Sequence, residues 1–187
     1  MKAELKTTAL KAALPFAATE RTRYAFDAVR VTEDGAILAT DGKAAIRVRP
    51  ADTEPPRDAT PSALLPRFRL EQLAKAATGD AIEIETEGTT YTARLETKLS
   101  SATTAPGDIS QGSFPALDRL FDREYTGEIR FNARVLESLL KAAKIYGKSQ
   151  DMTLITLRTA GKDQAAGFEI SNADGDTVEG LIMPVSE

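Results

Sequence analysis

The sequence VTEDGAILATDGKAAIRVR, residues Val31–Arg49, is divided into short apolar runs by two turn signals. Glu33-Asp34-Gly35 and Asp41-Gly42 each end in glycine, which accepts the positive φ that a tight turn requires. An Asp-Gly pair between apolar runs is the strongest short-range signal for a β-hairpin. The segment therefore predicts antiparallel strands at Ala36–Thr40 and Ala44–Arg49, which follow a strand at Tyr24–Val31.

The same order of a short strand, a helix and further strands recurs along the chain. Helical patterns begin near Thr7, Arg69 and Asn132, at intervals of 62 and 63 residues, which indicates a repeated structural unit. Thr7 and Asn132 are predicted N-caps, Gly79 and Gly147 are predicted helix ends, and Pro15 is expected to end or kink the first helix. The predicted helices are Thr8–Ala18, Arg69–Thr78 and Ala133–Tyr146. The other predicted strands are Lys2–Leu5, Ala63–Pro66, Ala81–Thr86, Thr90–Lys98, Glu128–Phe131, Met152–Thr159, Gly167–Asn172 and Thr177–Val185, with a connector at Pro50–Ser62 and a polar loop at Ser100–Ser113.

Positive charge is concentrated in the three helical segments although the chain has a net charge of −4. Residues 6–19, 67–79 and 132–148 hold nine basic and two acidic side chains. Repeated basic helices in an acidic chain predict one surface that faces a polyanion such as duplex DNA, bound through its phosphates without sequence readout. The alternative is that each helix is an ordinary solvated amphipathic helix, in which lysine is common. The DNA-facing candidates are Lys11, Arg67, Arg69, Lys75, Arg134, Lys141, Lys144 and Lys148.

The composition argues against an enzyme and against a cofactor or metal site. The chain has no cysteine and no histidine, which removes thiol nucleophiles and Ser-His pairs together with the commonest metal ligand. Glu83, Glu85 and Glu87 alternate along a predicted strand and share one face, which is conceivable for catalytic carboxylates but more typical of a solvated sheet face. Residues 172–176 (NADGD) lack the glutamate that completes a calcium loop, so a hairpin turn is the preferred interpretation.

The sequence also gives no sign of a membrane protein. No apolar run reaches the roughly 18 residues of a membrane span. The N-terminal stretch MKAELKTTALKAALPF is too interrupted by charge for a signal peptide. We therefore expect a cytoplasmic location without membrane contact.

Four motifs resemble the bacterial DNA polymerase III β subunit, the sliding clamp. They are Ala39-Thr40-Asp41-Gly42, Phe114-Pro115 followed by Leu120, Phe131-Asn132 before a leucine-rich helix, and Leu181-Ile182-Met183-Pro184-Val185. They occur in the same order as in that family. The first two units resemble the middle domain of the clamp, and the third resembles the second half of its last domain, so the chain looks like a shortened clamp.

The resemblance implies an α+β DNA-clamp fold built from strand-helix-strands half-domains, with antiparallel sheets outside and basic helices on one face. It divides the chain into a clamp-like domain of two half-domains at residues 1–122 and a single half-domain at residues 123–187. About twelve half-domains close a ring in this family, so a ring would need four copies of this chain. The alternative is a dimer in which the odd half-domains of two chains pair.

The resemblance also implies a function and a partner site. The function is that of a processivity factor that encircles or cradles duplex DNA and tethers a DNA polymerase or another partner through a peptide pocket. The alternative is a clamp-fold protein that forms no ring and competes for clamp-binding peptides. For Leu181–Val185 a buried edge strand is a further alternative. The pocket candidates are Thr40, Lys43, Ala45, Pro115, Leu120, Leu181, Met183, Pro184 and Val185. Lys43-Ala44-Ala45 is less bulky than is usual in the family, which implies a pocket that is shallower or that fits a different peptide.

Overall fold

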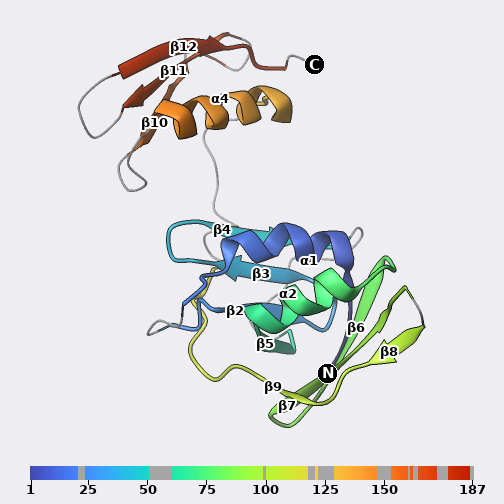
Figure 1. Cartoon of the computed structure of the whole chain (residues 1–187). Coiled ribbons are helices and arrows are strands. Elements are labelled where there is room, and N and C mark those ends of the chain that lie inside the picture. Colours follow the sequence, from blue (N-terminus) through green and yellow to red (C-terminus); the bar gives the residue numbers. More distant parts are fainter. Residues whose placement is uncertain are drawn as a thin grey trace. The chain divides into compact units, whose positions relative to one another are not determined.

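The computed structural model describes residues 1–20, 24–50, 60–98, 100–117, 121, 129–146, 153–159, 161, 164–171 and 177–185 (Figure 1). The chain divides into two compact units, Met1–Arg123 and Glu124–Glu187. Each unit combines α-helix with antiparallel sheet, which confirms the predicted α+β class.

The first unit contains two copies of the strand-helix-strands repeat. The first copy comprises β1 (Lys2–Lys6), α1 (Thr7–Ala13), the 3-10 helix η1 (Leu14–Phe16), β2 (Ala28–Thr32), β3 (Ile37–Thr40) and β4 (Ala45–Val48). The second comprises β5 (Ser62–Pro66), α2 (Arg67–Ala76), β6 (Ala81–Glu87), β7 (Thr90–Glu96), β8 (Ser101–Thr103) and β9 (Gly107–Asp108).

The two copies exchange their first strands. One sheet has the order β4-β3-β2-β5, and the other has the order β1-β6-β7-β8 with β9 also paired to β7. The two exchanges have the same register. Lys6, the residue before α1, lies opposite Ala81, the first residue of the strand after α2. Pro66, the residue before α2, lies opposite Ala28, the first residue of the strand after α1. Each sheet is therefore completed by the other copy, and neither copy is a self-contained structure.

The helices α1 and α2 contact each other, and one core lies between them and the two sheets (Figure 1). Leu10 and Leu70 occupy the same position in the two helices, four residues after the residue that precedes each helix, and both are fully buried. Residues on the inner faces of the sheets, such as Val29 and Ile82, complete this core. Packing rather than helix propensity holds these short helices, because isolated helices of their length are marginal in water.

The predicted hairpins around Gly35 and Gly42 are confirmed. Both glycines have positive φ, 81° and 88°, and β3 pairs with its neighbours β2 and β4. Asp41 closes the second turn because one of its carboxylate oxygens accepts hydrogen bonds from the backbone N–H groups of Lys43 and Ala44, both at 2.8 Å. These two bonds lower the pKa of Asp41, so its carboxylate is charged at neutral pH.

Among its described residues, the second unit has one helix and one sheet. Its elements are α4 (Ala133–Tyr146), β10 (Leu154–Arg158), β11 (Ala166–Ser171) and β12 (Thr177–Ile182), and the sheet order is β10-β11-β12. Leu139 and Ala143 of α4 pack on Ile170 and Ile182 of the sheet. The Asn132 side chain accepts a hydrogen bond from the Arg134 N–H at 2.9 Å, which confirms the predicted N-cap.

Several local predictions are wrong. Thr7 is the first residue of α1 rather than its cap, because its hydroxyl donates to the Gly79 carbonyl. Gly79 does not end α2, since the chain already leaves the helix at Ala77 in an extended conformation. The first helix does end early at Pro15, as predicted, where the chain forms η1. The predicted polar loop at Ser100–Ser113 contains the short strands β8 and β9, and the strand predicted at Tyr24–Val31 begins only at Ala28. The described residues 129–131, which were predicted as part of a strand, are not in one. The predicted helix end at Gly147 lies outside the described residues.

Candidate nucleic-acid interface

Two of the candidate cations on α2, Arg69 and Lys75, lie on the exposed surface of the helix. The Lys75 Nζ lies 2.8 Å from the Glu71 Oε1, one turn earlier, and the hydrogen bond from Lys75 lowers the pKa of Glu71. The Arg69 guanidinium lies 5.1 Å from the centroid of the Phe68 ring, a cation–π arrangement. Phe68 is 58% exposed, and the sequence analysis missed it because one aromatic residue next to a cation has no distinctive pattern.

The same arrangement recurs on α4. Lys141 Nζ lies 2.9 Å from Glu137 Oε1, and these residues hold the same helix positions as Lys75 and Glu71. Arg134 and Lys144 are also exposed. Each of these two helices thus presents cations together with one carboxylate. These glutamates are the two acidic side chains of the helical segments, and the pairing of each with the lysine four residues later was not predicted from the sequence.

The remaining candidates differ in their surroundings. Lys11 is exposed on α1, in agreement with a role at the surface. Arg67 is half-buried, and its Nε donates to the Leu14 carbonyl at 3.2 Å, so this side chain joins the start of α2 to the end of the first helical segment. Arg67 therefore has a structural role whether or not it meets a phosphate. Lys148 lies outside the described residues.

The two lysine–glutamate pairs weaken, but do not remove, the positive surface. The side chains of Lys75 and Lys141 are 75% and 69% exposed, and exposed i,i+4 pairs of this kind contribute little to stability. Either lysine can therefore leave its carboxylate for a phosphate at small cost. Lys75 and Lys144 also lie in the last turn of their helices, where the helix dipole favours a cation.

The candidates for the peptide pocket in the first unit differ in their exposure to solvent. Thr40 is 3% exposed, and its hydroxyl donates to the Ala44 carbonyl at 2.7 Å and accepts from the Gly42 N–H at 3.0 Å. Its polar group is thus used within the turn. Lys43 is exposed at the tip of that turn, Ala45 and Pro115 are half-buried, and Leu120 lies outside the described residues.

The candidates in the second unit form an exposed apolar row. Leu181, Met183 and Val185 alternate along the chain and are 75%, 66% and 51% exposed, whereas Ile182 between them is 2% exposed. Pro184 is half-buried, and the Val185 N–H donates to the Arg130 carbonyl at 2.8 Å, which holds this end of the row in place. The alternative of a fully buried edge strand is wrong, because three large apolar side chains face solvent.

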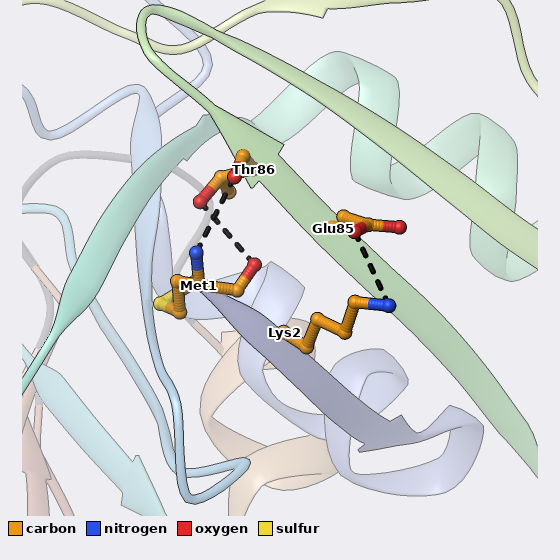
Figure 2. A network of polar contacts seen from close by, with 4 residues as sticks. All are labelled: Met1, Lys2, Glu85 and Thr86. Carbon is orange, nitrogen blue, oxygen red and sulfur yellow. Dashed lines mark hydrogen bonds and ion pairs between the residues drawn. The ribbon is translucent and has the colours of Figure 1, made fainter.

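The glutamates of β6 lie on a solvated sheet face. Glu83, Glu85 and Glu87 are exposed, and Glu85 forms an ion pair with Lys2 of β1 at 3.2 Å (Figure 2). Next to this pair the Met1 and Thr86 backbones are hydrogen-bonded, which ties the start of the chain to β6. Within the described residues no group of acidic side chains is arranged to hold a metal ion, and none of the described helices has the length and apolar character needed to cross a membrane.

Comparison with known proteins identifies the fold. Neither a protein-family model nor a curated protein matches the sequence. The β subunit of the Streptococcus pyogenes DNA polymerase matches with a TM-score of 0.71 and 19% identity, over 100% of this chain and 50% of that chain. A ligand-bound DNA polymerase sliding clamp from Pseudomonas aeruginosa matches with a TM-score of 0.74 and 16% identity, over 100% and 52%. The Caulobacter crescentus polymerase III β protein matches with a TM-score of 0.72 and 14% identity, over 100% and 51%.

The chain has the fold of bacterial sliding clamps. The predicted DNA-clamp fold is confirmed over the whole chain, which spans about half the length of the clamps it matches.

Proposed function

We propose that this protein is a sliding-clamp-like processivity factor that encircles or cradles duplex DNA and holds a DNA polymerase or another partner on it. The observation that carries the proposal is the recurrence of a helix with exposed cations in each half-domain of a clamp-type fold, in a chain whose net charge is −4. The cations lie at Lys11 on α1, at Arg69 and Lys75 on α2, and at Arg134, Lys141 and Lys144 on α4. Lys148 belongs to the same proposal by its place in the sequence.

Such a protein carries out no chemical step itself. It raises the effective concentration of its partner at the template, because binding to a tethered partner becomes intramolecular. Contacts to phosphates give affinity that does not depend on base sequence and that falls steeply with salt. If the assembly resembles the ring of the clamps, four copies of the chain supply about twelve half-domains and close it.

Topological retention on DNA tests this function. The protein is assembled in the presence of nicked circular DNA and is then moved to about 0.5 M salt, where phosphate contacts are largely screened. We expect protein to stay on the circle and to be released when a restriction enzyme makes the circle linear. Equal loss from circular and linear DNA would contradict an encircling ring.

We further propose that the exposed apolar row contributes to a site for a partner peptide. Thr40, Lys43, Ala45, Pro115 and Leu120 stay candidates for such a site by the resemblance alone. Exposed apolar side chains are typical anchors of peptide sites. A solved sliding clamp of Pseudomonas aeruginosa is bound to griselimycin, which makes this compound a suitable probe.

Replacement of both Leu181 and Met183 by alanine should weaken griselimycin binding at least about 10-fold, since two apolar anchors are removed. Isothermal titration calorimetry measures the effect. Phe68→Ala is the matched control, because Phe68 is also an exposed large apolar residue but lies on α2. Unchanged binding in the double variant, or equal loss in the control, would argue against the row as a peptide site.

A clamp-fold protein that forms no ring and competes for clamp-binding peptides is the second candidate. The pairing of Lys75 with Glu71 and of Lys141 with Glu137 favours it, because both carboxylates reduce the positive field of the helices. Griselimycin binding without retention on circular DNA would support this function over the first.

A further inference from the structure

In the half-domain of the second unit, apolar side chains are exposed at positions that are buried in both half-domains of the first unit. Residues are counted from the one that precedes each helix: Lys6, Pro66 and Asn132. Four, seven and eleven residues later, each of the three segments has a residue that packs in or against its core. Eight residues later the exposed fractions differ: Leu14 is 7% exposed and Ala74 is 2% exposed, but Leu140 is 53% exposed.

The strand that follows the helix shows the same difference. The fourth residue of this strand is Val31 in β2 and Ile84 in β6, which are 0% and 1% exposed. The fourth residue of β10 is Leu157, which is 45% exposed. The second residues, Val29 and Ile82, are fully buried, whereas Ile155 in β10 is only half-buried.

The first unit shows what covers these positions. The outer edge of β2 is paired with β5, and that of β6 is paired with β1, so the strand before one helix protects the strand after the other. Among the described residues β10 pairs only with β11. Within the part of the chain that the structure describes, the other edge of β10 therefore has no neighbouring strand, and exposed Leu154 and Leu157 lie in this strand.

The second unit also contains a segment that holds the same place before its helix as the strands that cover such an edge. Residues 129–132 precede α4 as β1 precedes α1, with Ile129 and Phe131 half-buried and Arg130 and Asn132 exposed. In β1 the carbonyl of Glu4 faces its own repeat, where it lies 2.6 Å from the place of a Cβ on Gly35. The carbonyl of Arg130 likewise faces its own half-domain, because it accepts from the Val185 N–H. The opposite edge of this segment is the one that β1 and β5 use to pair.

We propose that a second copy of this chain completes the half-domain. Residues 129–132 of each copy pair antiparallel with β10 of the other, and the helices α4 of the two copies pack against each other over Leu140. The register of β1 on β6 and of β5 on β2 places Asn132 opposite Leu154 and Arg130 opposite Thr156. The contact is two-fold and self-complementary, since each copy supplies one segment and one strand edge. Within the first unit β1 and β5 are already paired, so they do not supply the missing strand.

This interface would exist whether or not the protein acts on DNA, so its test is independent of the proposed function. The chain has no cysteine, and therefore an introduced pair is the only route to a disulfide. Pairing by the same register makes Arg130 and Thr156 a non-hydrogen-bonded pair, with Cα atoms about 4.5 Å apart, which is within the range of a disulfide. The double variant Arg130→Cys, Thr156→Cys should form a covalent dimer on mild oxidation.

The controls identify the register. Neither single cysteine variant should crosslink with itself, but a mixture of the two should. The double variant Arg130→Cys, Arg158→Cys shifts one cysteine by two residues to a diagonal distance of roughly 7–8 Å and should crosslink much less. Equal crosslinking of the shifted pair, or none in the Arg130–Thr156 pair, would overturn the proposal.

The mass in solution, measured by light scattering after size exclusion, gives a second test. The protein should be a dimer or an even multiple at about 50 μM, and Leu140→Glu should halve the mass, because a carboxylate is then buried at the contact of the helices. Leu181→Glu is the matched control and should leave the mass unchanged, since Leu181 is 75% exposed on the far strand of the sheet. A monomer at this concentration, or a folded Leu140→Glu variant of unchanged mass, would overturn the proposal.

Discussion

Replacement of Lys141 and Lys144 by glutamate should reduce affinity for duplex DNA about 100-fold at roughly 50 mM salt, because two phosphate contacts become two repulsions. Both lysines are exposed on α4, so the change should leave the fold intact. The loss should be similar for unrelated DNA sequences. The plot of log affinity against log salt concentration should become less steep by about 2, as two released counterions are lost. Fluorescence anisotropy over a series of salt concentrations measures both effects.

The double variant Lys43→Glu, Lys98→Glu is the matched control. It produces the same change in net charge at two exposed lysines that lie outside the helices. We expect a much smaller loss of DNA affinity in this control, because only long-range repulsion is changed. Equal losses in the two double variants would show that net charge, and not the helix surface, determines DNA binding.

The replacement Gly180→Ala should destabilise the second unit by about 1–3 kcal/mol, the usual cost of adding an atom where a core side chain already lies. Gly180 lies opposite Phe168 in the β11–β12 pair, and a Cβ at this position would overlap the Phe168 ring. The ring would have to leave the core of the unit, against which it packs. Urea unfolding followed by circular dichroism, together with hydrogen exchange of β11 and β12, measures the effect.

Gly167→Ala is the control for this change. Gly167 is also in β11, but the atom nearest to a Cβ added at this position would be the Arg158 Cβ, at an ordinary 3.9 Å. Because glycine weakens a strand, this replacement should be neutral or slightly stabilising. A similar loss of stability in both variants would mean that the contact with Phe168 does not explain the role of Gly180.

Short-range signals in the sequence were enough to predict much of the secondary structure. The helix Ala133–Tyr146 agrees with the structure at both ends, because its apolar stripe is regular and Asn132 caps it. The hairpin at Asp41-Gly42 was found from a turn that depends on four adjacent residues. Four motifs in order then led to the clamp fold, although the identity to the solved clamps quoted above is at most 19%.

The prediction of Thr7 as an N-cap failed because its partner is distant in sequence. The Thr7 hydroxyl donates to the Gly79 carbonyl, 72 residues away, and Arg67 likewise contacts Leu14, 53 residues earlier. No local pattern reveals such contacts. The place of Arg67 at a DNA-facing surface and that of Thr40, whose hydroxyl is bonded within its own turn, at a partner site both stay predictions.

The repeat, the turns and the concentration of positive charge on three helices follow from the amino-acid sequence alone, because these properties depend on residue type and on spacing along the chain. The pairing of β1 with β6 and of β5 with β2 was not predictable in this way, since strand pairing depends on burial and register between segments far apart in sequence. The same exchange shows that Leu140 and Leu157 are exposed where their counterparts are buried. An apolar residue that is core in one half-domain and uncovered in another looks the same in the sequence, because its burial depends on whether a second half-domain packs against it.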